Sequence, residues 1–273
     1  MLDIIKDALI DALKLVPFLF LSFILMELIE HKFTNKKKLS KISKFGPLAG
    51  SALGIIPQCG FSALASNLYA ARVITLGTLF SIYLSTSDEM LPILISSKAA
   101  TKEIILLLLT KFALGFIFGL LVDLFYQKKR NTPKKEIHNL CEEEHCHCED
   151  SILKSSLFHT LKITFFIFII NIFLNSIIDK EIIMTFTENN KILSPLIMSL
   201  IGLIPNCASS VIITELYLEN VITFGSCIAG LLCGSGVGIL VLFKQNHHLK
   251  ENLLIVLTMI VFSSLCGIIL NII

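Results

Sequence analysis

Charged residues are scarce in this chain of 273 residues: Asp, Glu, Lys and Arg make up 16%, whereas hydrophobic residues make up 54%. A soluble domain needs about a quarter of its residues charged to cover its surface. The mean hydropathy is +0.80, and the apolar runs exceed the ~18 residues that distinguish spanning helices from buried core helices. These features exclude a single soluble domain and predict an all-α integral membrane protein embedded in a lipid bilayer.

Several functional motifs are also missing. No Walker A pattern and no His-Glu-x-x-His pattern occurs, and the one histidine near an apolar core, His159, lies at a helix start, so we expect neither an enzyme nor a resident cofactor. The formal net charge is only +2, and the lysines lie in blocks at the ends of apolar segments, which argues against nucleic-acid binding. The first segment lacks a basic n-region and a small-residue cleavage site, so we expect it to remain as a membrane helix.

The sequence contains an internal duplication. The motif Gly54-Ile55-Ile56-Pro57-Gln58-Cys59 returns as Gly202-Leu203-Ile204-Pro205-Asn206-Cys207, at an offset of 148 residues (205 − 57). Without a gap, the same offset pairs Pro47 with Pro195, Ser62 with Ser210, Tyr69 with Tyr217, Gly77 with Gly225 and Ser87 with Ser235. Chance does not hold a register over this length, so the chain consists of two related halves.

Each half is predicted to hold three spanning helices and one broken segment, about ten helical segments in all. The spanning helices are expected at about 4–30, 73–97 and 103–126, and again at 153–178, 221–243 and 252–272. The segments 46–70 and 194–218 contain Pro57 and Pro205, which break a helix, so each is predicted to be a hairpin of two half-helices. The domains follow as a first repeat (1–127), a cytoplasmic linker (128–152) and a second repeat (153–273).

Lysine-rich loops predict the orientation of these repeats. The loop 32–44 and the loop 128–135 are both rich in Lys and Arg, and short loops of this kind stay in the cytoplasm. The chain must therefore cross an even number of times between them, which leaves an odd number of crossings in each half. The second repeat is then inserted upside down relative to the first, and inverted repeats with discontinuous helices are typical of secondary transporters.

Polar residues inside the apolar segments are the candidates for a transport site. Asp88 and Glu89 lie deep in the predicted helix 73–97, where ionisable groups are costly and indicate function; the alternative is that they reach the membrane surface or pair with Lys98. Cys59 and Cys207 directly follow the proline breaks. They either belong to a substrate site or are small residues that pack in the interior. Their neighbours complete the candidate set: Gln58 and Asn206, and the hydroxyls Ser62 and Ser210, which line the same cavity or bond their own backbone.

The central linker carries a second signal. Its tract 141–150 contains five potential metal ligands, Cys141, His145, Cys146, His147 and Cys148, surrounded by carboxylates. Thiolates and imidazoles at this density suit zinc, copper(I) or another thiophilic ion. The tract lacks paired Cys-x-x-Cys knuckles, so we expect a flexible tract that collects or senses metal; the alternative is a solvated acidic linker.

Four features carry a resemblance to a known family: the paired proline motifs, the Ser85–Glu89 stretch, the Gly234–Gly238 stretch and the His/Cys/Glu-rich linker. With them, the chain resembles the bacterial family of ten-transmembrane heavy-metal exporters. Members carry the labels arsenic efflux permease or manganese transporter. The resemblance covers nearly the whole chain. It implies a multi-pass protein of the bacterial cytoplasmic membrane that exports a metal or metalloid.

The ligand chemistry leaves the substrate open. Arsenite-type species prefer thiolates and point to Cys59, Cys207 and Cys233, whereas manganese prefers oxygen ligands and points to Asp88, Glu89, Gln58 and Asn206. Energy would come from an ion or proton gradient or from a separate ATPase subunit. Two alternatives remain: a permease for an uncharged solute such as an organoarsenical, and a metal-sensing membrane scaffold. The sequence also leaves the oligomeric state open, a homo-oligomer included.

Overall fold

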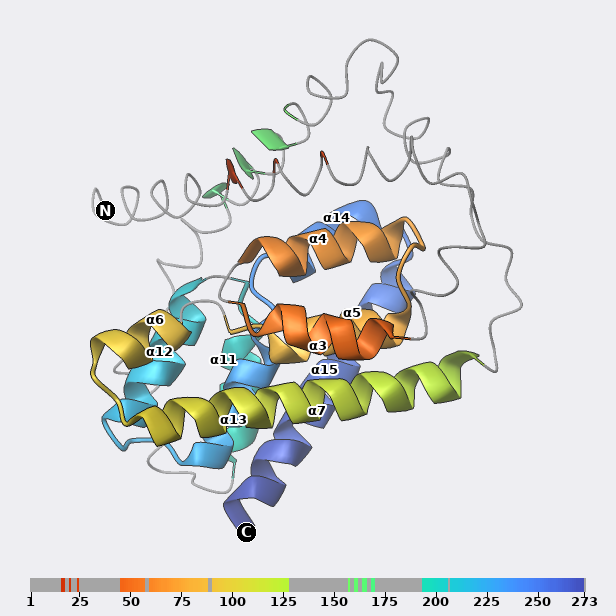
Figure 1. Cartoon of the computed structure of the whole chain (residues 1–273). Helices are drawn as coiled ribbons and strands as arrows, with labels where there is room; N and C mark the ends of the chain where they lie inside the picture. The colour runs from red at the N-terminus through yellow and green to blue at the C-terminus, as the bar shows by residue number, and fades with distance from the viewer. Residues whose placement is uncertain are drawn as a thin grey trace.

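The computed structural model of the chain describes residues 45–56, 59–87, 90–127, 193–205 and 207–272, and isolated residues at 16–24 and 157–169. Only the helical backbone is described for residues 59, 60, 207 and 208. Every regular element in the described ranges is an α-helix (Figure 1). In chain order they are α3 (Gly46–Gly54), α4 (Cys59–Ala70), α5 (Leu76–Ser85), α6 (Met90–Ser96), α7 (Thr101–Gln127), α11 (Ser194–Gly202), α12 (Cys207–Leu218), α13 (Phe224–Cys233), α14 (Gly238–Gln245) and α15 (Leu249–Ile272).

Three stretches of the described chain are long and apolar enough to cross a membrane: Thr101–Tyr126, Phe224–Gln245 and Leu249–Ile272. The 27 residues of α7 extend about 40 Å at 1.5 Å per residue, more than the ~30 Å of a bilayer's hydrocarbon core. Large apolar side chains such as Leu109 and Leu257 are more than half exposed on α7 and α15. These faces need lipid to cover them, which agrees with the prediction of an integral membrane protein.

The helices repeat at the offset seen in the sequence. The helices α3, α4 and α5 begin and end 148 residues before α11, α12 and α13. The turns that follow α4 and α12 match as well, because Arg72 and Asn220 have φ angles of 60° and 58°, the left-handed conformation that ends a helix. Thr75 and Thr223 then cap α5 and α13. Their hydroxyls accept from the amides three residues on, those of Thr78 at 3.1 Å and Ser226 at 3.3 Å.

Glycine pairs bring the central helices of each half into backbone contact. A Cβ added to Gly77 of α5 would lie 2.1 Å from the carbonyl oxygen of Gly119 in α7. The equivalent Cβ on Gly225 of α13 would lie 2.3 Å from the carbonyl oxygen of Gly267 in α15. Small residues allow this close approach of membrane helices. The duplication therefore extends from sequence to helix packing.

Two predicted elements are wrong, because the segments 73–97 and 221–243 are not continuous helices. The first is interrupted after α5, where Thr86 has a ψ of 128° and its hydroxyl donates to the carbonyl of Ile82 at 2.7 Å. The Thr86 amide donates to the same carbonyl at 3.0 Å, so the hydrogen-bond ladder of α5 is intact up to Thr86 and ends there. The second is interrupted between α13 and α14, where Gly234 leaves the helix with a ψ of 75° and Gly236 has a φ of 53°, a left-handed conformation that glycine adopts readily.

The two halves exchange helices. The half-helix α4 of the first half packs against α14 of the second, and α12 of the second half packs against α6 of the first (Figure 1). Reciprocal contacts of this kind arise when two units are related by an approximate twofold axis. The direction of that axis relative to a bilayer, and hence the predicted inversion, stays a prediction.

An ion pair joins the halves at one end of the bundle. Arg72, in the turn after α4, donates from Nη1 and Nη2 to Oε1 and Oε2 of Glu251 in α15, both at 2.7 Å. The Tyr69 hydroxyl also donates to Glu251. The hydrogen bond to Glu251 raises the pKa of Arg72 above its already high value, so the charge pair is permanent. Forked pairs of this kind fix geometry as well as charge.

Glu251→Gln is expected to lower the free energy of unfolding by about 1–3 kcal/mol, because it removes a charge-assisted, two-pronged contact that is only about one fifth exposed. The thermal midpoint of the purified chain in detergent measures this change. Glu103→Gln, at the equivalent place in the first half, is the control, since Glu103 is exposed. Equal midpoints for Glu251→Gln and the wild type would show that the ion pair does not hold the halves together.

Candidate transport site at the helix breaks

Four helix interruptions define the candidate site. They lie between α3 and α4 (55–58), α5 and α6 (86–89), α11 and α12 (203–206), and α13 and α14 (234–237). A chain that leaves its helix at membrane depth exposes carbonyl and amide groups that no helical neighbour satisfies. Such groups are tolerated where protein buries them or where they line a cavity.

Within each half, the two interruptions lie against one another. The Ser87 hydroxyl, beside the α5–α6 interruption, donates to the carbonyl of Ile55 beside the α3–α4 interruption at 2.6 Å. In the second half, a Cβ added to Gly234, in the α13–α14 interruption, would lie 3.7 Å from the carbonyl oxygen of Gly202, the last residue of α11. The first pair is thus linked by a hydrogen bond and the second by close approach of the backbones.

Lys111 joins the interruptions of the two halves. Its side chain projects from α7 and is 1% exposed. The ammonium donates to the carbonyl of Thr86, at the end of α5, and to the carbonyl of Leu231, near the end of α13, the latter at 2.8 Å. A single side chain therefore connects the carboxyl ends of both central half-helices.

The sequence argument missed Lys111, although a signal was available. It is the one charged residue between Glu103 and Asp123, in the apolar interior of α7, and a lone ionisable residue in a spanning segment indicates a functional site. The equivalent position in α15 is Met259, which is fully buried. The lysine is therefore a difference between the halves, as are Asp88 and Glu89, whose counterparts are Gly236 and Val237.

The predicted serines do not have equivalent surroundings. Ser62 is fully buried where α4 meets α14, because a Cβ added to Gly238 would lie 2.7 Å from the Ser62 Cβ. Nearby, the Ser66 hydroxyl lies 2.6 Å from the Tyr83 hydroxyl and donates to Gly238 at 2.7 Å. Ser210 is half-buried in α12, and its carbonyl accepts from Thr214 at 2.7 Å. Ser62 therefore lies at a contact between the halves.

The remaining predicted ligands are placed in part. Cys59 and Cys207 are the first residues of α4 and α12, so each begins the half-helix that follows a proline break. Outside the described residues lie Gln58, Asp88, Glu89 and Asn206, together with the linker ligands Cys141, His145, Cys146, His147 and Cys148. Among the described residues, no three His, Cys, Asp or Glu side chains are close enough to hold a metal ion together.

Among the described residues, two buried polar side chains without hydrogen-bond partners lie in the α13–α14 interruption (Ser235) and in α4 (Asn67). Ser235, in the α13–α14 interruption, is fully buried with an unbonded hydroxyl, and both polar atoms of the buried Asn67 side chain in α4 are unbonded. Ser235 is the counterpart of Ser87, whose hydroxyl is bonded to Ile55. Buried polar groups are nearly always bonded, so an unbonded hydroxyl at a helix break is a candidate contact for a transported species.

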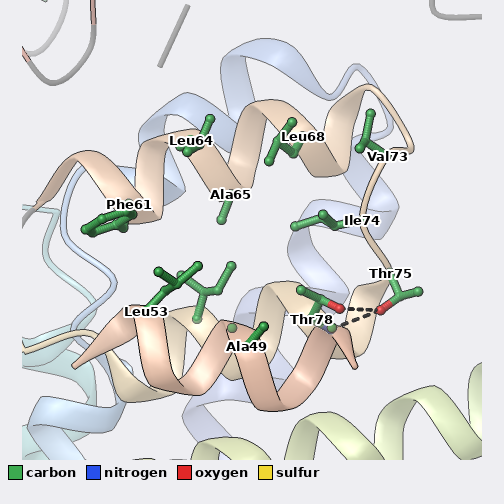
Figure 2. A pocket seen from close by; sticks show the side chains of 13 residues that line it. Ala49, Leu53, Phe61, Leu64, Ala65, Leu68, Val73, Ile74, Thr75 and Thr78 are labelled. Atoms are coloured by element: carbon green, nitrogen blue, oxygen red, sulfur yellow. Dashed lines mark hydrogen bonds between the residues drawn. The ribbon is translucent and has the colours of Figure 1, made fainter. Parts of the chain in front are cut away.

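An apolar cavity of about 160 Å³ lies between α3, α4 and α5. Figure 2 shows Leu53 and Phe61 at one end of it, and Thr75 and Thr78 at the other. The two half-helices run in opposite directions along this cavity, as the predicted hairpin requires. Among the described residues that line it, the side-chain hydroxyls are those of Thr75 and Thr78, and the rest of the lining is apolar. The cavity suits a hydrocarbon chain or an uncharged solute rather than a metal ion.

Broken helices that meet inside a duplicated membrane bundle agree with what a comparison with protein families finds. The model of the family described as "Putative, 10TM heavy-metal exporter" matches residues 1–178 and 146–273, which overlap and together span the chain. The chain belongs to this family.

The resemblance seen in the proline motifs is thereby confirmed, and with it a multi-pass membrane protein of a heavy-metal exporter family. No curated protein matches the chain, and no solved structure does. The family match covers both halves and the linker. The coarse function of this exporter-family member rests on that match, and its substrate has to be argued from the site.

Proposed function

We propose that the chain exports a heavy metal or metalloid, either manganese or an arsenic species, from the cytoplasm across the bacterial cytoplasmic membrane. The substrate would pass where the four helix interruptions meet. The observation that carries this proposal is the bridge from Lys111 to Thr86 and Leu231, which places the carboxyl ends of two broken helices from different halves at one point. Secondary transporters bind substrates at such meeting points of discontinuous helices.

Inverted repeats are part of the proposal, and the positions of the helix ends support them. Thr75 donates to Asp123 at 2.6 Å, so the first hairpin returns to the end of α7 that leads into the Lys-rich linker. The second hairpin instead packs through α12 against α6, which leads into the opposite end of α7. Hairpins that open toward opposite ends of one spanning helix agree with alternating access from the two sides of the membrane.

Two ligand sets compete for the substrate. Cys59 and Cys207 begin α4 and α12, and Cys233 is buried at the end of α13, two residues after the carbonyl that binds Lys111. Thiols in this arrangement favour arsenite-type species. The oxygen set includes Asp88 and Glu89, which directly follow Ser87 in sequence and favour manganese. Because no Walker A motif is encoded, a proton or ion gradient is the proposed energy source.

Cells that lack their own exporters are expected to accumulate less of one species when they express this chain. The candidates are manganese, zinc, iron, copper, arsenite and methylarsenite, and cell-associated content of each is measured by mass spectrometry against an empty vector. Removal of a substrate from the cytoplasm lowers its steady-state content, so the affected species names the cargo. Unchanged content for all six, with the chain present in the membrane, would contradict metal and metalloid export.

A second candidate is passage of an uncharged solute, and the apolar cavity between α3, α4 and α5 favours it. An organoarsenical such as methylarsenite carries an apolar methyl group and no net charge at neutral pH. It would enter such a cavity at a lower desolvation cost than a metal ion. Lower methylarsenite content with unchanged manganese and arsenite content, in the same cells, would favour this candidate over metal-ion export.

A further inference from the structure

The Lys111 ammonium lies where two helix dipoles end. Thr86 is the residue that ends α5, and Leu231 is two residues from the end of α13. The amide of Ser235, which would bond to the Leu231 carbonyl in a continuous helix, bonds to Cys233 at 2.9 Å instead. The Leu231 carbonyl is therefore released from its helix and accepts from Lys111 at 2.8 Å.

Two converging helix ends create a preference for a positive charge. The carboxyl end of a helix carries roughly −0.5 of an elementary charge, so two such ends at one point attract about one monovalent cation. Released carbonyls and half-helix carboxyl ends are the groups that coordinate sodium ions in broken-helix transporters. An ammonium group has three donors and no acceptor, so it satisfies the same oxygens that a small monovalent cation would.

The first half supplies the lysine that reaches these helix ends, and the second half has no lysine at the equivalent place. Lys111 reaches the carboxyl ends of both α5 and α13, whereas its counterpart Met259 is apolar and fully buried. A purely structural lysine at the surface would contact solvent, but this side chain is 1% exposed. The desolvation cost of burying an ammonium is offset only where oxygen ligands are supplied, which these helix ends do.

We propose that the carboxyl ends of α5 and α13 form a monovalent-cation site, and that the chain fills it permanently with the ammonium of Lys111. Lys111 then holds the two halves together where α5 and α13 end, and no sodium ion or other small cation binds there. The binding of Lys111 at these helix ends does not depend on which solute is exported.

Removal of the ammonium should leave a site that a small cation from solution fills. In purified Lys111→Ala, measured in N-methylglucamine chloride because that cation is too large to enter, the thermal midpoint is expected to fall by about 5 °C or more. Ethylammonium or sodium chloride at the same ionic strength should recover at least half of the loss. Lys111→Met, whose apolar side chain fills the volume, should be destabilised without recovery. Lys102→Ala, an exposed lysine of the same helix, is the matched control and should respond to neither.

The thermal midpoint of the wild-type protein supplies a second test that needs no substitution. Because the site of the wild-type protein is already filled, its midpoint should rise less between N-methylglucamine chloride and sodium or ethylammonium chloride than the midpoint of Lys111→Ala does. An equal rise in the wild type would overturn the proposal, as would a Lys111→Ala protein that no small cation restores or that is as stable as the wild type in N-methylglucamine. These readouts use stability alone, so loss of the proposed transport function would leave them unchanged.

Discussion

Alanine at Gly77 is expected to lower the free energy of unfolding by about 3 kcal/mol, through overpacking of two membrane helices. The added Cβ would lie 2.1 Å from the backbone carbonyl of Gly119 and 2.5 Å from the Asp123 carboxyl carbon. Backbone cannot move aside as a flexible side chain does, so α5 and α7 must separate. Separation also weakens the hydrogen bond from the Gly77 amide to Asp123, which is 2.9 Å long. Denaturant or thermal unfolding of the purified chain measures the loss.

The second half offers a repeat of this experiment. Gly225→Ala should cost a similar amount, because its Cβ would lie 2.3 Å from the Gly267 carbonyl. The matched control is Gly234→Ala, whose Cβ meets nothing closer than 3.5 Å and whose φ of −75° suits any residue. If Gly77→Ala and Gly234→Ala proved equally stable, the close packing of α5 on α7 would be wrong.

The largest effect on transport is expected from the paired substitution Asp88→Asn with Glu89→Gln. If manganese is the substrate, the export rate should fall about 10-fold or more. Removing a residue that only supports a metal ligand already lowers metal affinity or activity about 10-fold, and removing the ligand itself should lower it at least as much. Both substitutions keep side-chain volume and remove charge, so packing is little disturbed. Uptake into inverted membrane vesicles from expressing cells measures the rate.

The thiol pair supplies the opposite test. Cys59→Ser with Cys207→Ser should abolish export of arsenite while sparing manganese, since serine keeps the size but not the affinity for a thiophilic species. If both double variants transport at the wild-type rate, neither ligand set binds the substrate. The site would then have to be sought among other polar groups, such as Ser235 in the α13–α14 interruption, which is buried and unbonded.

Much of the fold could be predicted because duplication leaves a register in the sequence. The offset of 148 residues, read from the Pro57 and Pro205 motifs, recurs in the bounds of α3 to α5 and α11 to α13. The proline breaks were predicted correctly as the ends of half-helices, because proline cannot continue the hydrogen-bond ladder. Both signals are local chemistry, which one sequence displays directly.

The breaks after α5 and α13 could not be predicted from apolar patterning. Ser85, Thr86 and Ser87 are compatible with a helix, and the interruption depends on a contact between segments, the bond from Ser87 to Ile55. The role of Lys111 likewise depends on carbonyls from two halves that lie 145 residues apart in sequence (231 − 86). Hydropathy averages such tertiary features away, because each is one polar residue among many apolar ones.

Flux through the purified full chain in proteoliposomes tests the central claim most directly. Liposomes with and without the protein are exposed to manganese, arsenite or methylarsenite, with and without an imposed proton gradient, and internal content is followed over time. The account predicts protein-dependent movement of one of these species, faster with the gradient and lost in the double variant of the matching ligand set. Equal content in protein-containing and protein-free liposomes, for every species and gradient, would contradict it.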